Sequence, residues 1–237
     1  MCGRYASSAR AEDLAGVFGI RPEQVVDRPE PSYNVAPTDP VPGVLTRTSG
    51  DQAARELRVL HWGLVPRWAG DARGAARRIN ARVETVATLP AYRSALAARR
   101  CLLPADGYYE WATGSHGRRQ PYFLRPPGGS CLAFAGLYER WRDPTGQLRW
   151  TATILTTGAI GPLADLHDRM PMVVPELNWE AWLDPDLTNA HEALSLPMSP
   201  SELLTAYPVH PRVGNVRESG AGLIAPVETD SEVLDFR

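Results

Sequence analysis

Short apolar runs separated by turn residues dominate the middle of the chain. Between residues 101 and 157 the runs are CLLP, GYYEW, PYFLR, CLAFAGLYERW and LRWTATILTT, and the turn sequences PPGG and DPTG separate several of them. Runs of this length that are rich in β-branched and aromatic residues are typical of strands. Upstream, GVLTRT and ELRVLHWG flank Ser49-Gly50, so a hairpin is predicted there.

Helical patterns lie mostly outside this region. Apolar residues three or four apart predict a helix from Ser8 to Gly19, where the glycine can end it. A second helix is predicted from Thr88, as its cap, through Arg100. After residue 175, ELNWEAWL and SELLTAY are the best helical candidates. With no internal repeat or convincing linker, the pattern predicts one α+β domain built on largely antiparallel sheets.

We expect this domain to span residues 1–227, followed by an acidic, frayed tail at 228–237. The 237 residues are 43% hydrophobic and 22% charged, as in soluble globular proteins. No apolar run is long enough to span a membrane, and no signal peptide is visible. Three widely spaced cysteines argue against a disulfide framework and fit a reducing cytoplasm, and the lack of paired Cys or His motifs argues against a zinc site.

Charge is distributed unevenly along the chain. Residues 58–100 carry nine Arg and two acidic residues, a balance of +7, whereas residues 176–237 carry eleven acidic residues and three Arg, a balance of −8. A basic segment in a chain of net charge −2 suggests an anion-binding face, with nucleic acid as the obvious partner. A solvated, arginine-rich helix is the alternative explanation.

The chain contains no Lys, since all 25 basic residues are Arg. Arg stays protonated at any relevant pH and cannot act as an amine nucleophile. Imine chemistry would therefore require the N-terminal amine, a group with a pKa of about 7.7–8.0 that is partly neutral at pH 7. The chain opens MCGRY, so removal of Met1 would leave Cys2 with an α-amine and a thiol on adjacent carbons. An ordinary cysteine near a frayed end is the alternative.

Two segments hold residues suited to acid–base chemistry. In GYYEW, strand alternation places Tyr108 and Glu110 on one face, where a carboxylate among apolar groups needs a partner or a raised pKa. LHDRMP brings together His167, a residue type that titrates near neutral pH, and Arg169, a candidate phosphate ligand. A structural ion pair for Glu110 and a structural role for His167 remain open at this point.

Two other segments hold residues suited to nucleic acid. INARVET places Asn80, Arg82 and Glu84 on one face if the segment is extended, and an Asn–Arg pair suits a phosphate or a sugar. WGLVPRW supplies Trp62 and Trp68, either of which could stack on unpaired bases. Core packing is the favoured interpretation for Trp62, and for Trp68 both interpretations stay open.

Taken in order, MCGRY, YNVAP, WGLVPRW, NARVET, DGYYEW, AGLYERW, LHDRMP and HPRVGNV resemble the SOS response-associated peptidase (SRAP) family, whose members act on abasic sites in DNA. The matches extend from residue 2 to about residue 227. MCGR at the start together with NAR-x-E-T, GYYEW and HDRMP is a highly specific combination. The resemblance implies an open, barrel-like core of antiparallel sheets flanked by helices.

In this family the cysteine at position 2 reacts with the ring-opened aldehyde of an abasic site in single-stranded DNA. Its α-amine forms an imine with C1′, and its thiol then closes a thiazolidine that protects the site from strand cleavage. By motif, the resemblance implies that Cys2, Asn80, Glu110 and His167 are catalytic. Asn80 would position the N-terminus and the sugar, Glu110 would handle protons during crosslinking and its reversal, and His167 would lie near the sugar oxygen.

The expected partner is thus single-stranded DNA with abasic sites, bound by a monomer in the bacterial cytoplasm without a cofactor or metal. The expected DNA-contacting residues are Arg4, Asn34, Pro37, Trp68, Arg82 and Arg169. The chain departs from the family pattern in two places. Some members have a second tryptophan where this chain has Ala69, and some have a phosphate-binding arginine where it has Leu89-Pro90, for which Arg93 would have to compensate.

Two other functions stay open. Glutaminase domains also begin with Cys-Gly, so the chain could be an N-terminal-nucleophile amidohydrolase, or a peptidase that removes residues before Cys2. A non-enzymatic reader of modified DNA bases is the other alternative, and it would not need Cys2 at the terminus. The basic segment and the two tryptophans favour DNA, because a glutamine pocket needs neither.

Overall fold

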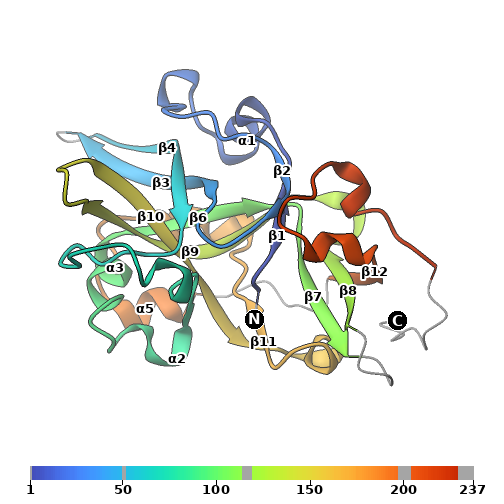
Figure 1. Ribbon diagram of the computed structural model, residues 1–237. Coiled ribbons are helices and arrows are strands. Elements are labelled where there is room, and N and C mark those ends of the chain that lie inside the picture. Colours follow the sequence, from blue (N-terminus) through green and yellow to red (C-terminus); the bar gives the residue numbers. More distant parts are fainter. Residues whose placement is uncertain (1, 50–51, 114–118, 197–203, 229–237) are drawn as a thin grey trace.

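The structure is a computed structural model that describes residues 2–49, 52–113, 119–196 and 204–228. Of the tail expected at 228–237, residues 229–237 lie outside the described residues, as does Gly50 of the predicted turn. The fold consists of two β-structures with short helices around them. Figure 1 shows one of them, a barrel, on the left, and β7, β8 and β12 of the other on the right.

Five long strands form the barrel, in the order β10-β4-β3-β6-β9, and β9 pairs back onto β10 to close the ring. Two short strands add to β10, which is parallel to one of them and antiparallel to the other. The predicted α+β class with a barrel-like core is therefore confirmed, and the β9–β10 pairing closes this barrel. The strands are β3 Pro40–Ser49, β4 Gln52–Trp62, β6 Arg100–Ala105, β9 Leu132–Arg142, β10 Leu148–Gly158, β5 Asn80–Arg82 and β11 Arg169–Pro171.

Alternating side chains on the barrel strands explain its two cores. On β4, Leu60 and Trp62 pack with the inner cluster, whereas Leu57 packs with the helices outside. The barrel is narrow enough to require a residue without a side chain: a Cβ at Gly136 of β9 would lie 2.8 Å from Cys101 Sγ. The predicted hairpin is confirmed, because β3 and β4 pair in register down to Ser49 opposite Gln52.

A second, antiparallel sheet packs against the barrel, in the order β12-β8-β7-β1-β2. Tyr108 of β7 belongs to the core cluster shared with the barrel, whereas Tyr109 packs on the opposite face of the sheet. The alternation predicted for GYYEW is thus confirmed. The strands are β1 Tyr5–Ser7, β2 Ser32–Val35, β7 Gly107–Thr113, β8 Arg119–Arg125 and β12 Thr205–Pro208.

Within the described residues, five short helices cover the outside of the barrel, and short 3-10 helices lie elsewhere along the chain. The first helix confirms the sequence prediction, since it ends where Gly19 adopts a left-handed conformation with φ 63°. ELNWEAWL is also confirmed as helical in its second half. The helices are α1 Ala11–Phe18, α2 Val83–Val86, α3 Arg93–Ala98, α4 Trp179–Leu183 and α5 Ala190–Leu194.

Two helix predictions were wrong. The helix expected from Thr88 through Arg100 begins only at Arg93, because Thr88 bonds back to the Thr85 carbonyl and Arg100 already pairs with β9 as the first residue of β6. The helix expected for SELLTAY is replaced in its last residues by β12, and residues 201–203 lie outside the described ones. Pairing of β12 along β8 outweighs the weak helical periodicity of so short a segment.

Candidate functional site

The N-terminal segment runs between the barrel and the second sheet, so that Cys2 lies in the core. Figure 1 shows the N-terminus beside β11 and β7, below the barrel. The Cys2 side chain is 0% exposed and packs with residues of the barrel interior. Burial raises the pKa of its thiol far above the usual range, and the nearby Glu110 carboxylate adds to this effect. The thiol is therefore protonated at neutral pH.

Asn80 holds the backbone of Cys2. Its Nδ2 donates a hydrogen bond of 2.8 Å to the Cys2 carbonyl oxygen. The residue is held in place because β5 pairs with β10, where Asn80 lies opposite Ile154. The other side-chain atom, Oδ1, is buried and has no hydrogen-bond partner in the described part of the chain. Asn80 thus fixes the position of Cys2, and its Oδ1 atom is available to accept a further hydrogen bond.

Glu110 lies on the face of β7 that turns toward the barrel. It is only 6% exposed, and burial raises the pKa of its carboxyl. The charge of His167 opposes this rise, so both Cys2 and His167 lie close enough to interact electrostatically with Glu110. A carboxyl group whose pKa moves toward neutral pH is suited to exchange protons with neighbouring groups. The face predicted for Glu110 is the one observed.

His167 lies in the turn before β11, and its ring is positioned through Nδ1. This nitrogen lies 2.9 Å from the backbone N–H of Arg169, from which it accepts, and 2.8 Å from Oδ1 of Asp168. A neutral ring takes the first contact, with its proton on the other nitrogen, whereas a protonated ring donates to the carboxylate. These contacts at Nδ1 therefore hold the ring in one orientation.

Arg169 forms a two-pronged ion pair with Glu84, with N–O distances of 2.7 and 2.9 Å. Its Nη2 also donates to the Thr156 carbonyl at 2.6 Å. Glu84 reaches Arg169 from helix α2. The condition for a face shared by Asn80, Arg82 and Glu84 is therefore not met, because the strand ends at Arg82. The hydrogen bonds from Arg169 lower the pKa of Glu84. No local pattern predicts this pair, because its members are 85 positions apart.

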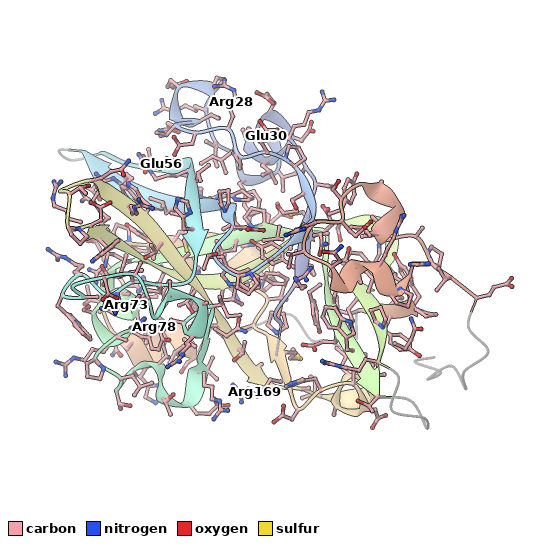
Figure 2. The ribbon with its side chains drawn as sticks, viewed as in Figure 1. Arg28, Glu30, Glu56, Arg73, Arg78 and Arg169 are labelled. Carbon is pink, nitrogen blue, oxygen red and sulfur yellow. The ribbon has the colours of Figure 1, made fainter. Side chains whose placement is uncertain are left out.

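Arg82 and Arg169 flank the same end of β10. Arg82 of β5 lies opposite Thr156, and Arg169 of β11 lies opposite Gly158 on the other edge of the strand. Arg82 is exposed, whereas Arg169 is partly buried under its ion pair. Figure 2 shows Arg169 at the lower edge of the molecule, next to β11. At this end of β10, Arg82 therefore presents an exposed positive charge, whereas the charge of Arg169 is paired with Glu84.

Arg4 and Asn34 are joined inside the protein. The Arg4 guanidinium donates to Asn34 Oδ1 and to the carbonyl oxygens of Val213 and Gly214, and both side chains are buried. Asn34 in turn donates to two further carbonyl oxygens near residues 215–218. These contacts fasten the C-terminal segment to β2, and a DNA contact by Arg4 or Asn34 stays a prediction. Pro37, in the loop after β2, is partly buried.

The two tryptophans of WGLVPRW differ in their surroundings. Trp62 is fully buried in the barrel and donates to the Ile79 carbonyl, as the core-packing interpretation predicts. Trp68 is 70% exposed and lines a cavity of about 450 Å³ together with Arg93. The segment is held by a hydrogen bond from Trp141 to the Ala69 carbonyl. No hydrogen bond of the described residues links Trp68 to the N-terminal site.

The structure thus brings together the four residues that the sequence marked as catalytic, which we call the Cys2 cluster: Cys2, Asn80, Glu110 and His167. Within the described residues, no group of three or more His, Cys, Asp and Glu side chains could hold a metal ion. Among the described helices, none is long and apolar enough to cross a membrane.

Comparison with known proteins assigns a family to this arrangement. Residues 1–216 match the family model described as SOS response associated peptidase (SRAP). The chain is 35% identical to the abasic site processing protein YoqW of Bacillus subtilis over 94% of this chain and 99% of that protein. It is 30% identical to the abasic site processing protein HMCES of Gallus gallus, over 96% of this chain and 78% of that protein.

A solved structure agrees with the fold. A Bacteroides thetaiotaomicron protein superimposes with a TM-score of 0.80 at 26% identity, covering 96% of this chain and all of that one. The match of the family model to nearly the whole chain, together with these relatives, identifies the class of protein that the Cys2 cluster and the barrel define. The chain belongs to the SOS response associated peptidase family.

Proposed function

We propose that this protein processes abasic sites in single-stranded DNA by crosslinking itself to them through Cys2. The convergence on Cys2 of Asn80 from β5, Glu110 from β7 and His167 from the turn before β11 carries this proposal. The names of the relatives, abasic site processing proteins, support the same substrate. The protein would act on DNA in the bacterial cytoplasm and work as a monomer.

The reaction requires removal of Met1, because the nitrogen of Cys2 is otherwise an amide and cannot form an imine. The freed α-amine attacks the aldehyde carbon C1′, and loss of one water gives the imine. The Cys2 sulfur then adds to that carbon, the thiol proton passes to the nitrogen, and a five-membered thiazolidine closes. A raised thiol pKa suits this order, since the sulfur stays protonated until the imine has formed.

The remaining residues have roles that fit their contacts. Asn80 holds the Cys2 carbonyl, so the amine is fixed relative to the incoming sugar. Glu110, with its raised pKa, takes protons from the amine and returns them when the crosslink reverses. His167 protonates the sugar oxygen during ring opening. Arg82, Arg169 and Trp68 hold the strand by its phosphates and bases.

The burial of Cys2 also distinguishes the alternatives. A cysteine amidohydrolase depends on the thiolate as the first nucleophile, and burial disfavours the thiolate here. In the proposed reaction the amine attacks first, so a neutral thiol is no obstacle. Self-removal of residues before Cys2 would be a separate, single-turnover reaction of the same cluster. A protein that only recognises modified bases would not need the Cys2 cluster.

Denaturing electrophoresis with single-stranded DNA that carries one abasic site tests the proposal. Intact mass confirms beforehand that Met1 is absent from the protein. We expect a heat-stable shifted band without added borohydride, which is lost in Cys2→Ala. A Cys2→Ala band of equal intensity, or no band from protein with a free Cys2, would contradict the proposal.

A further inference from the structure

Four arginines gather around a second cavity at the end of the barrel away from Cys2. Its volume is about 450 Å³, and its lining consists of Arg67, Arg99, Arg140, Arg142 and Leu148, which we call the arginine cavity. In Figure 1 the hairpin from β9 to β10, which carries residues 142–148, lies at the left edge of the molecule. The cavity is thus built from three separate parts of the chain.

The charge of the arginine cavity is largely uncompensated. Arg99 is ion-paired with the buried Glu139 at 2.7 Å, but no ion pair of the described residues involves Arg67, Arg140 or Arg142. The three unpaired arginines are exposed. No acidic side chain lines the cavity. Three guanidinium groups around one hollow favour a ligand with several negative oxygens.

Aromatic packing orders one of these arginines before any ligand arrives. The Arg140 guanidinium lies 5.1 Å from the centre of the Trp150 ring, which is itself stacked on Tyr138. On the same ring, Arg58 lies at 4.3 Å but is ion-paired with Glu56 at 3.0 Å. Arg140 therefore has a fixed direction and an available charge, and less side-chain entropy is lost when it binds an anion.

The position of the cavity relates it to the Cys2 cluster. Leu148 begins β10 and Ile154, the partner of Asn80, lies six residues further along the same strand. At about 3.3 Å per residue the two points are roughly 20 Å apart, a distance that corresponds to several nucleotides of a single DNA strand. Arg67 lines both this cavity and the one that contains Trp68, so the two are neighbours.

From this geometry we propose that the arginine cavity is a phosphate-binding site for DNA that flanks the abasic site, several nucleotides from C1′. This inference rests on the proposed function, because the strand is placed by its attachment near Cys2. Arg140 and Arg142 grip backbone phosphates, Arg67 joins the cavity to the stacking surface of Trp68, and no base is read. The protein therefore holds a long strand more tightly than a short one, without a change in chemistry.

Equilibrium binding of undamaged DNA, measured by fluorescence anisotropy at several salt concentrations, tests this proposal. We compare the wild type with the double variant Arg140→Ala/Arg142→Ala on strands of about 20 and about 5 nucleotides. The expected loss of affinity for the long strand is about tenfold, and the slope of log K against log salt becomes shallower by about 1.4, for two phosphates. The loss of affinity for the short strand should be smaller, because a strand of this length can occupy the surface near Cys2 without reaching the arginine cavity.

A matched control removes two exposed, ion-paired arginines near α1, in Arg21→Ala/Arg28→Ala. Figure 2 shows Arg28 at the top of the molecule. The conservative variant Arg140→Lys/Arg142→Lys keeps the charge and should keep the wild-type salt slope. Thermal unfolding confirms that each variant is folded. Crosslinking of the short strand, with its abasic site, reports separately on the proposed function and is unaffected in all variants.

Two results would overturn the proposal. One is an unchanged affinity and salt slope for the long strand in Arg140→Ala/Arg142→Ala. The other is an equal loss in the control variant, which would mean that any two positive charges contribute alike. If either result is found while the short strand crosslinks normally, only the role of the arginine cavity is rejected. If the wild type does not crosslink at all, the proposed function itself is rejected.

Discussion

The two ends of the barrel differ in whether their polar side chains are buried or exposed. At the Cys2 cluster, the thiol and the carboxyl are buried, and burial shifts both pKa values upward. At the arginine cavity, three of the four charged side chains are exposed, and that of Arg140 packs against an aromatic ring. Burial favours the uncharged form of a thiol or a carboxyl group, while an exposed guanidinium keeps its charge. The first end is suited to chemistry and the second to holding a polyanion.

This contrast also explains how the basic residues are used. Arg4, Arg100 and Arg169 lie near the core and bond to carbonyl oxygens of the protein. Arg140 and Arg142 belong to the far end of the barrel and are exposed. An arginine count along the sequence does not separate these two groups. Single substitutions of buried and exposed residues test this difference through stability, DNA affinity and crosslinking rate.

The largest effects should come from the two tryptophans. Trp62→Ala empties the barrel interior next to Tyr5 and should cost about 3–5 kcal/mol of unfolding free energy. Trp68→Ala should change stability by less than about 0.5 kcal/mol but weaken DNA binding by about 1–3 kcal/mol. Denaturant unfolding and anisotropy measure the two quantities. Equal losses of stability in the two variants would contradict the difference in burial between Trp62 and Trp68.

The next largest effect is expected for Asn80→Ala. Loss of the hydrogen bond to the Cys2 carbonyl leaves the amine less well positioned, so crosslinking should slow by about 100-fold. Affinity for undamaged DNA should stay near that of the wild type, because the contact is within the protein. Single-turnover crosslinking rates check this, with thermal unfolding as the folding control. An unchanged rate would mean that Asn80 does not position the reacting amine.

Glu110→Gln should change the pH dependence of both rate and stability. Because the folded-state pKa is raised, the folded protein holds this proton to higher pH than the unfolded chain does. Stability is highest below the ordinary carboxyl pKa and falls as pH rises to the raised value. The Gln variant should lack that fall and be more stable than the wild type at neutral pH, with a crosslinking rate about tenfold lower. A wild-type pH profile in the variant would contradict this.

The smallest effect is expected for Glu84→Gln. The pKa of Glu84 is lowered by Arg169, so the ion pair stabilises the fold above the ordinary carboxyl pKa and is lost as pH falls through the lowered value. Since Glu84 is half exposed, the loss at pH 7 should not exceed about 0.5 kcal/mol. Urea unfolding at pH 7 and at low pH measures it. A loss above 2 kcal/mol would show that the pair is a main support of this end.

Local patterns predicted much of the fold. The β3–β4 hairpin, α1 with its glycine end and the two faces of GYYEW follow from periodicity and turn residues, which depend on neighbours along the chain. The SELLTAY helix failed because β8 offers an edge for pairing that the segment itself does not encode. The closure of β9 on β10 is likewise a contact between whole strands.

The site was predictable only in part. The residues of the Cys2 cluster came from motifs, but the partners of Arg4 and Arg169 lie between 13 and 210 positions away along the chain. The arginine cavity was not predicted from the sequence, because Arg140 and Arg142 lie outside the basic segment 58–100. Strand alternation alone cannot show that two arginines at the end of β9 meet others from a distant loop.

The most direct test of crosslinking through Cys2 compares wild-type protein with Cys2→Ser on single-stranded DNA with one abasic site. Both have an N-terminal amine once Met1 is removed, but only the wild type has a sulfur to close the ring. The wild type should give a heat-stable band without borohydride, and Cys2→Ser should give a band only after borohydride reduction of the imine. Equally stable bands from both proteins without borohydride would contradict this expectation, since the thiol would then have no part in the linkage.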